Sequence, residues 1–265
     1  MKHRYLPMTE QDQKEMLETI SISSIDELFS DIPEKVRFKG LYNIKEAKSE
    51  SALAKELTAL AAKNADTVNN VSFLGAGVYN HYKPVIVDHV ISRSEFYTAY
   101  TPYQPEISQG ELQAIFEFQT MIAELTGMDL ANSSMYDGGT ALAEAGMLAA
   151  GHTKRKKLLV SGAIHPEYKD VVITYADGQS IEVISVPTKD GVTHIDSLRG
   201  LVDDQTAAVI VQYPNFFGQI EDLKAIGEIV HEQKGLFIVS ANPLALGILT
   251  PPGKLGADIV AGDAQ

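Results

Sequence analysis

Short apolar runs separated by helical segments fill the second half of the chain, and this alternation constrains the fold more than any other feature. Residues 207–211 (Ala-Ala-Val-Ile-Val) are apolar on both faces of an extended chain, as a sheet covered by helices requires. Strands that alternate with helices form βαβ units around a mainly parallel sheet, so the sequence predicts an α/β fold. The expected strands lie at residues 158–160, 183–186, 207–211, 236–239 and 258–260, and the clearest helix at 221–234.

The N-terminal part of the chain reads as helices. Thr9 and Asp12 have the spacing of a capping box at a helix start. Leucines at helical spacing predict a second helix over residues 49–62. We therefore expect an N-terminal helical extension at residues 1–70 and a large α/β domain at residues 71–265.

The α/β domain is expected to begin with a loop-rich connector at residues 71–109, which holds glycines, prolines and aromatic residues. A helix should follow, because Ser108 and Glu111 have capping-box spacing and Gly127 supplies a C-terminal stop. Its expected buried face consists of Leu112, Ile115, Phe116, Ile122 and Leu125.

Composition excludes several functions. A formal net charge of −13 makes binding to nucleic-acid phosphates or anionic lipid unfavourable. The chain has no cysteine, which excludes disulfides, thiolate catalysis and cysteine-ligated metal, and which fits a reducing compartment. The first residues are not followed by an apolar run, and no stretch approaches transmembrane length. We expect a cytoplasmic protein without a secretory signal.

A glycine turn at residues 136–140 has two interpretations. Gly139 and Thr140 at a helix start offer backbone N–H groups and a hydroxyl to an anion. An ordinary turn before a helix explains the same five residues, and taken alone they favour it. Gly-x-Gly-x-x-Gly and P-loop patterns are absent, so the sequence lacks the sharpest signs of dinucleotide or NTP binding.

Two further segments, 75–82 and 97–105, combine glycine or proline with tyrosines and polar groups. Such segments clasp a small ligand or pack at a subunit interface, and composition does not separate the two. His165 follows an expected strand, where α/β proteins often hold ligands, although a lone histidine there is more often structural. The histidines lack ligand spacing and Gly-x-Ser-x-Gly is absent, so neither a metal site nor the usual hydrolase site is predicted.

Taken in order, these segments resemble one family. Residues 72–80 (Ser-Phe-Leu-Gly-Ala-Gly-Val-Tyr-Asn) are similar to its glycine-rich opening, and residues 100–110 (Tyr-Thr-Pro-Tyr-Gln-Pro-Glu-Ile-Ser-Gln-Gly) to its most specific motif. The match continues at residues 119–121, 132–134 and 212–215. The family is glycine dehydrogenase (decarboxylating), the P-protein of the glycine cleavage system. The chain looks like subunit 1 of its split bacterial form, the subunit without the cofactor lysine.

The resemblance implies a three-layer α/β/α fold of the pyridoxal-phosphate (PLP) dependent transferase type, fold type I. Gly139 and Thr140 would then form a vestigial phosphate turn. Where the resemblance gives the lysine-bearing subunit the residues Asp-Gly-Ala-Asn, this chain has Val239-Ser240-Ala241-Asn242. Val239 thus replaces the aspartate that would pair with the pyridine nitrogen. The chain ends at Gln265, where the active subunit would place its lysine. Lys154, Lys156 and Lys157 are expected to form a solvated run.

The implied function is decarboxylation of glycine, with transfer of the aminomethyl group to the lipoyl group of H-protein. The PLP would reside on a lysine-bearing P-protein subunit 2, and this chain alone would be inactive. A complete subunit of the family is longer, so we expect a truncated chain. A self-sufficient fold-type-I PLP lyase or transferase and a purely structural partner remain alternatives. The residues expected to form the active-site wall by motif match are Ser72, Tyr79, Asn80, Tyr100 and Tyr103.

Overall fold

The computed structural model describes residue 5, residues 7–77 and residues 79–264, and it divides into two compact units, Met1–Val71 and Ser72–Gln265. The first unit contains α1 (Glu10–Thr19), the 3-10 helix η1 (Ile25–Phe29) and α2 (Glu50–Ala61). The capping box predicted for α1 is confirmed. The amide of Asp12 donates to the Thr9 hydroxyl at 3.2 Å, and the Asp12 carboxylate accepts from the Thr9 amide at 2.7 Å.

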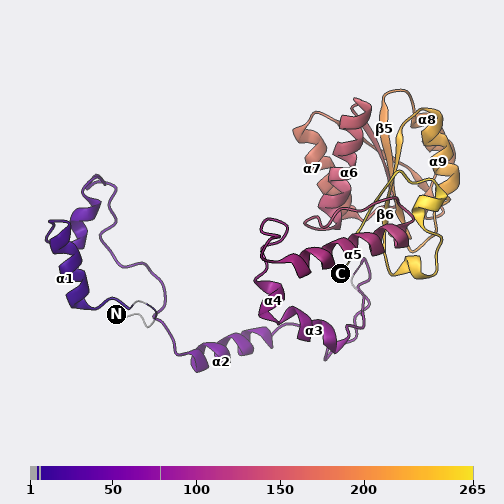
Figure 1. Cartoon of the computed structure of the whole chain (residues 1–265). Coiled ribbons are helices and arrows are strands. Elements are labelled where there is room, and N and C mark those ends of the chain that lie inside the picture. Colours follow the sequence, from indigo (N-terminus) through magenta and orange to yellow (C-terminus); the bar gives the residue numbers. More distant parts are fainter. Residues whose placement is uncertain (1–4, 6, 78, 265) are drawn as a thin grey trace. The chain divides into compact units, whose positions relative to one another are not determined.

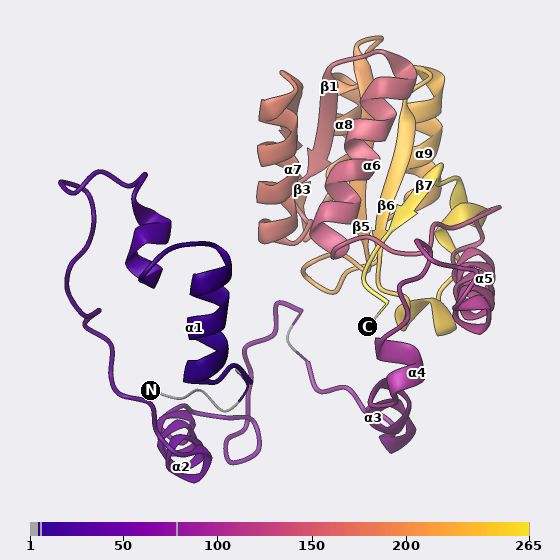
Figure 2. The ribbon, with the colours of Figure 1, turned by 60° about the vertical axis from the view of Figure 1, so that its left-hand side comes forward.

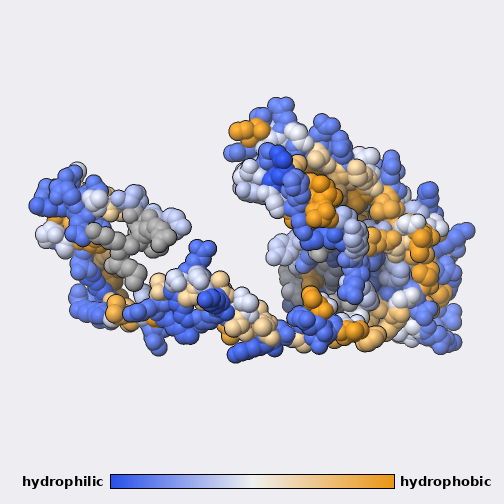
Figure 3. All heavy atoms as spheres, turned by 90° about the horizontal axis from the view of Figure 1, so that it is seen from below, coloured by the Kyte–Doolittle hydropathy of each residue, from blue (hydrophilic) through white to orange (hydrophobic). Residues whose placement is uncertain are grey.

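The apolar side of α2 is exposed in this chain. Leu53, Leu57 and Leu60 recur at helical spacing, as predicted, and each keeps about half of its surface in solvent. Figure 3 shows apolar patches on the visible surface of both units. A helix with an exposed apolar side contributes little burial to its own stability, so most of its stabilisation must come from packing against other surfaces.

The segment predicted as a loop-rich connector contains two short helices, α3 (Val85–Ile91) and α4 (Ser94–Tyr97), so that prediction is wrong in part. The apolar run of α3 is mostly β-branched, which favours strands, but in the described part of the chain it pairs with none. Pro84 stands at the N-cap of α3, where its missing N–H costs nothing.

Helix α5 (Gln109–Thr126) ends as predicted at Gly127, whose φ of 73° is the left-handed conformation that favours glycine. Its predicted capping box is wrong: Ser108 is the N-cap residue, but its side chain accepts no capping hydrogen bond. The ψ of Ser108 is 46°, outside the extended range that points an N-cap hydroxyl at the helix amides. The predicted buried face is also partly wrong, because Phe116 is 60% exposed.

The five predicted strands are confirmed, and they form one parallel sheet in the order β2-β1-β5-β6-β7. Strand β5 is buried along nearly its whole length, as its apolar sequence on both faces predicts. A two-stranded hairpin, β3 (Thr188–Lys189) with β4 (Val192–Thr193), stands apart from the sheet. The sheet strands are β1 (Lys157–Ser161), β2 (Glu182–Val186), β5 (Thr206–Tyr213), β6 (Leu236–Ala241) and β7 (Ile259–Ala261).

Helices cover both faces of the sheet and complete three layers (Figure 1). Helices α6 (Gly138–Thr153) and α7 (Pro166–Gly178) pack on one face, and α8 (Ile195–Leu201) and α9 (Leu223–Glu232) on the other. Each face has its own apolar cluster. The 3-10 helices η2 (Ala245–Gly247) and η3 (Pro252–Leu255) lie between β6 and β7 in the chain.

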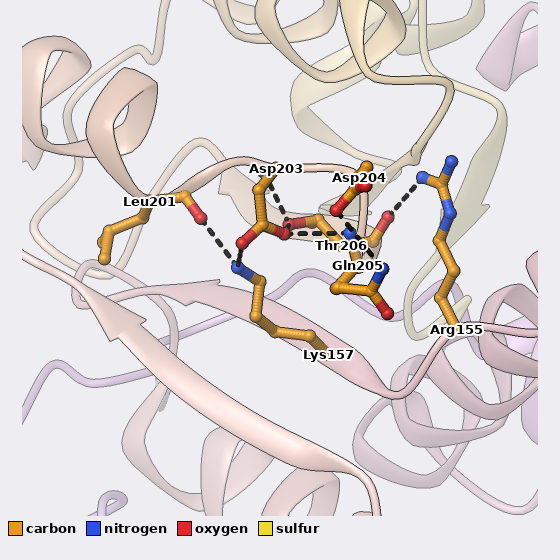
Figure 4. Close-up of polar contacts among 7 residues, drawn as sticks. All are labelled: Arg155, Lys157, Leu201, Asp203, Asp204, Gln205 and Thr206. Carbon is orange, nitrogen blue, oxygen red and sulfur yellow. Dashed lines mark hydrogen bonds and ion pairs between the residues drawn. The ribbon is translucent and has the colours of Figure 1, made fainter.

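Lys157 links the amino end of β1 to the loop before β5, and its environment differs from the sequence-based prediction. Lys157 is expected in a solvated run with Lys154 and Lys156, but it is buried. Its Nζ donates to the Leu201 carbonyl at 2.9 Å and lies 2.6 Å from a carboxylate oxygen of Asp203 (Figure 4). Lys157 is the first residue of β1, so the pleat of the strand directs its side chain into the domain.

Candidate functional site

The carboxyl ends of the parallel strands meet at one edge of the sheet, which is where α/β proteins hold their ligands. Three chain segments end there: His165 follows β1, Asn215 follows β5 and Asp263 follows β7. The start of α6 joins them through a hydrogen bond from the Gly138 amide to Asp263 Oδ1 at 2.9 Å. In Figure 2 the start of α6 and the C-terminal end of the chain lie at this same end of the sheet.

The first turn of α6 is capped by its own residues. Asp137 is the N-cap, and its Oδ1 accepts from the Thr140 amide at 2.7 Å. The Thr140 hydroxyl lies 2.7 Å from the same oxygen, and it accepts in turn from the Asp137 amide at 3.1 Å. These hydrogen bonds lower the pKa of the Asp137 carboxyl, with the Thr140 amide as the largest cause. The hydroxyl that the sequence offers to an external anion is therefore engaged within the turn.

Asp263 bridges α6 and α7. One carboxylate oxygen accepts from Gly138, and the other accepts from the hydroxyl of Tyr168 on α7. Burial raises the pKa of the Tyr168 phenol, and its hydrogen bond to Asp263 raises it further, so the phenol remains a donor at neutral pH. A side chain at Gly138 would overlap both Asp263 and Tyr168, so this close approach requires glycine.

His165 connects the glycine-rich segment to the sheet edge. Its ring lies 5.2 Å from that of Tyr168 and 5.4 Å from that of Phe216 between centroids, and its Nε2 is 3.1 Å from the Ala76 carbonyl oxygen. The His165 amide donates to Gln212 Oε1 at 2.8 Å. The ring is therefore held by aromatic packing and by one contact to a backbone carbonyl, while its Nδ1 is buried without a hydrogen-bond partner in the described part of the chain.

The loop after β5 is anchored by a buried polar network. The Asn215 side chain accepts from the amides of Phe217 and Gln219 at 3.0 Å and donates to Glu221 at 2.8 Å. Glu221 also accepts from the Thr193 amide at 3.0 Å. The sequence pattern places Glu221 within a helix, but α9 begins two residues later, after its N-cap Asp222. The carboxylate is instead the partner that satisfies the buried amide and side-chain donors of this loop.

The residues predicted to form the active-site wall are exposed. Tyr100 and Tyr103 lie together, with ring centroids 5.1 Å apart, and keep 63% and 76% of their surfaces in solvent. Ser72, Tyr79 and Asn80 are exposed as well, and among the described residues none of them is hydrogen-bonded to either tyrosine. Of the five residues, the structure thus shows a direct contact between the two tyrosines.

An open hollow of about 1010 Å³ lies beside β7, on the side of the sheet edge that carries the start of α6. Residues 128–137 form one wall and residues 258–264 another, so both Asp137 and Asp263 line it. Among the described residues no group of three or more histidines and carboxylates comes together as a metal site would require. No helix in the described ranges is long and apolar enough to cross a membrane.

The residues at this edge do not fit PLP. A cofactor phosphate would need the first amides of α6, but Asp263 holds the Gly138 amide and Asp137 holds the Thr140 amide. The pyridine nitrogen would need an acid, and the corresponding position is Val239, which is fully buried in the apolar cluster beneath α9. Both mismatches lie in this chain's own residues.

Sequence reasoning missed Tyr168 and Asp263. Asp263 stood out only as part of the tail after the last apolar run, and Tyr168 as an unremarkable aromatic residue near a helix start. One signal was available for Asp263: it directly follows a parallel strand, and the carboxyl ends of such strands converge where the α6 glycines also lie. Nothing in the sequence signalled the contact between Tyr168 and Asp263, which are 95 positions apart.

The layers and the strand order define the class of the chain, which is the α/β/α fold of PLP-dependent, fold-type-I enzymes. This confirms the predicted fold class. The chain matches the family described as glycine cleavage system P-protein over residues 3–265, and it belongs to that family.

Close relatives carry the name of one subunit. Probable glycine dehydrogenase (decarboxylating) subunit 1 from Lysinibacillus sphaericus is 83% identical over all 265 residues, and that from Bacillus pumilus is 76% identical. A crystal structure of glycine decarboxylase (P-protein) in inhibitor-bound form superposes with a TM-score of 0.88 at 44% identity, covering 98% of this chain and 58% of that one. The chain spans 59% of the length of the two curated relatives.

Proposed function

We propose that this chain is part of subunit 1 of a cytoplasmic, two-subunit glycine decarboxylase, and that the PLP resides on its lysine-bearing partner. The assembled enzyme removes CO₂ from glycine and passes the aminomethyl group to the lipoyl group of H-protein. One observation carries the proposal: a member of the P-protein family has Asp263 at the helix start where the fold's cofactor phosphate would bind. A subunit of this kind depends on a partner for the cofactor.

The exposed tyrosine pair is suited to reach into an active site that lies on the partner subunit. Tyr100 and Tyr103 present phenolic hydroxyls on a segment stiffened by Pro102 and Pro105, so little ordering is needed on binding. A phenol donates one hydrogen bond and excludes water with its ring. In the proposed assembly these side chains, with Ser72, Tyr79 and Asn80, form a wall that orients the glycine carboxylate and screens it from solvent.

Exposed apolar surface supports a partner. Leu53, Leu57 and Leu60 of α2, Phe73 and Leu74 before the glycine-rich segment, and Val85 and Ile86 of α3 each expose 47% or more of their surface. Groups of exposed large apolar residues on monomers mark interaction sites. Packing of these elements against subunit 2 would give α2 and α3 the burial that they lack here.

Reconstitution tests the proposal. This chain, with any continuation that its gene encodes, is expressed alone and together with the lysine-bearing subunit. Glycine–bicarbonate exchange is then measured with lipoylated H-protein. We expect exchange only from the co-purified pair, and borohydride reduction should place pyridoxyl-lysine on the partner alone. A site-specific pyridoxyl-lysine on this chain would support the self-sufficient PLP enzyme instead. A pair that assembles, but whose partner is equally active without this chain, would support a purely structural role.

A further inference from the structure

Two amides in the first turn of α6 are held by carboxylates from within the chain. An α-helix leaves its first amides without intrahelical partners, and a phosphate-binding fold uses them for its ligand. Here the Gly138 amide donates to Asp263 and the Thr140 amide to Asp137, at 2.9 and 2.7 Å. Asp263 lies 125 positions from Gly138 in sequence, so ordinary local capping accounts for only one of the two acids.

We propose that Asp263 is a built-in occupant of the anion-binding end of α6, and that it excludes phosphate-bearing ligands from this edge of the sheet. Its carboxylate takes the place of a phosphate group and complements the positive end of the helix, as a bound anion would. Tyr168 holds the second carboxylate oxygen, so the acid is fixed from two helices at once. This inference does not rest on the proposed function, because it concerns only contacts within the chain.

Charge and space both oppose a phosphate here. With Asp137 and Asp263 at the same helix end, a phosphate dianion would meet two carboxylates at close range. The position in front of the Gly138 amide is already occupied, because Asp263 Oδ1 lies 2.9 Å from it. A ligand phosphate could bind only by displacing Asp263, which would break its hydrogen bonds to both Gly138 and Tyr168.

The test measures binding of inorganic phosphate and, separately, of PLP by titration calorimetry. The wild-type chain is compared with Asp263→Ala, Asp263→Asn and the control Asp222→Asn. The control removes the same charge from another helix start, at α9, where Asp222 accepts from the Ala225 amide at 3.1 Å. Freeing one amide from a charged partner should tighten phosphate binding about ten- to a hundredfold in Asp263→Ala. Asp263→Asn keeps the shape and should tighten it less, and Asp222→Asn should behave as wild type.

A second measurement needs no variant. In wild-type chain labelled with ¹⁵N-glycine, the amide resonances of Gly138 and Gly139 should stay in place when phosphate is added. A phosphate-dependent shift of these resonances would overturn the proposal even if both Asp263 variants fail to fold. Asp263→Ala that folds and binds phosphate no more tightly than Asp222→Asn would overturn it as well.

Discussion

The carboxylate of Asp203 lies 2.6 Å from Nζ of Lys157, at the amino-terminal edge of the sheet. The lysine is 11% exposed at its side chain and the aspartate 52%, so the pair joins a buried cation to a solvated anion. Thr206 Oγ1 also donates to Asp203, at 3.0 Å, so this carboxylate links the start of β5 to the start of β1 (Figure 4). The contact lies at the strand ends opposite the candidate site, so it can be tested for stability without touching that site.

We expect the Lys157–Asp203 pair to make the stability of the chain depend on acid. The hydrogen bond from Lys157, more than any other cause, holds the pKa of Asp203 below its ordinary value of 3.8. A group whose pKa is lowered by folding stabilises the fold above its unfolded pKa, and this contribution is lost as the pH falls through the folded pKa. Asp203→Asn should therefore cost about 0.2–1 kcal/mol near neutral pH, as for a solvent-screened pair, and less below pH 3.8. Urea unfolding at a series of pH values checks this. An equal loss at every pH would contradict it.

Gly138→Ala should destabilise the chain, because its methyl group would push Asp263 and Tyr168 away from the start of α6. Overpacking of this kind costs about 1–3 kcal/mol. Gly151→Ala in the same helix is the matched control, since nothing lies within 4 Å of its added methyl group. Alanine there should stabilise α6 by about 0.5–1 kcal/mol. Thermal unfolding of the two variants should thus shift in opposite directions, and a Gly138→Ala variant as stable as Gly151→Ala would refute the close contact.

Glu221→Gln should loosen the loop after β5. Glutamine places an N–H₂ group among donors, so either the Thr193 amide or the Asn215 side chain loses its acceptor. An unsatisfied buried group costs about 1–3 kcal/mol. Glu228→Gln makes the same change at an exposed position of α9 and should be nearly neutral. Urea midpoints measure the difference, and hydrogen exchange should show faster exchange at the Phe217 and Gln219 amides only in Glu221→Gln.

Tyr100→Phe should lower glycine turnover in the assembled enzyme while subunit assembly persists. Loss of one hydrogen bond to a charged group costs about 1.5–3 kcal/mol, or roughly ten- to a hundredfold in rate. Phenylalanine keeps the ring that packs on Tyr103, so packing should change little. The matched control is Tyr42→Phe in the first unit, where Tyr42 stacks on Phe38 at 5.1 Å. Normal turnover by Tyr100→Phe, with loss of assembly only in Tyr100→Ala, would make the segment an interface element.

The layered fold could be predicted because its signal is local. Each apolar run is long enough for one strand, and burial on both faces leaves no alternative to a helix-covered parallel sheet. Gly127 and the Thr9–Asp12 pair could be predicted for the same reason, since their hydrogen bonds span only a few residues. The Ser108 cap failed because spacing does not determine the ψ of the N-cap residue, on which the direction of its hydroxyl depends. Lys157 was misplaced because two other lysines closely precede it, and only the start of β1 turns its side chain inward.

The site could be predicted only in outline. The α6 glycines and His165 were found because each stands at an expected junction of strand and helix. The contacts of Asp263 with Gly138 and Tyr168 join residues far apart in the sequence. No local sequence pattern predicts such contacts. The absence of an acid at position 239 was inferred from the resemblance to a family. The structure adds that Val239 is apolar and fully buried.

The closure of α6 by Asp263 bears on how the protein matures in the cell. An enzyme that binds a phosphate ester at a helix start is more stable with its cofactor than without it, so its abundance follows the supply of the vitamin from which the cofactor is made. In this chain the corresponding helix end is bound by Asp263, a side chain of the protein itself. We therefore expect the stability of this chain to be independent of the supply of vitamin B6, and its amount in cells to persist through vitamin B6 starvation.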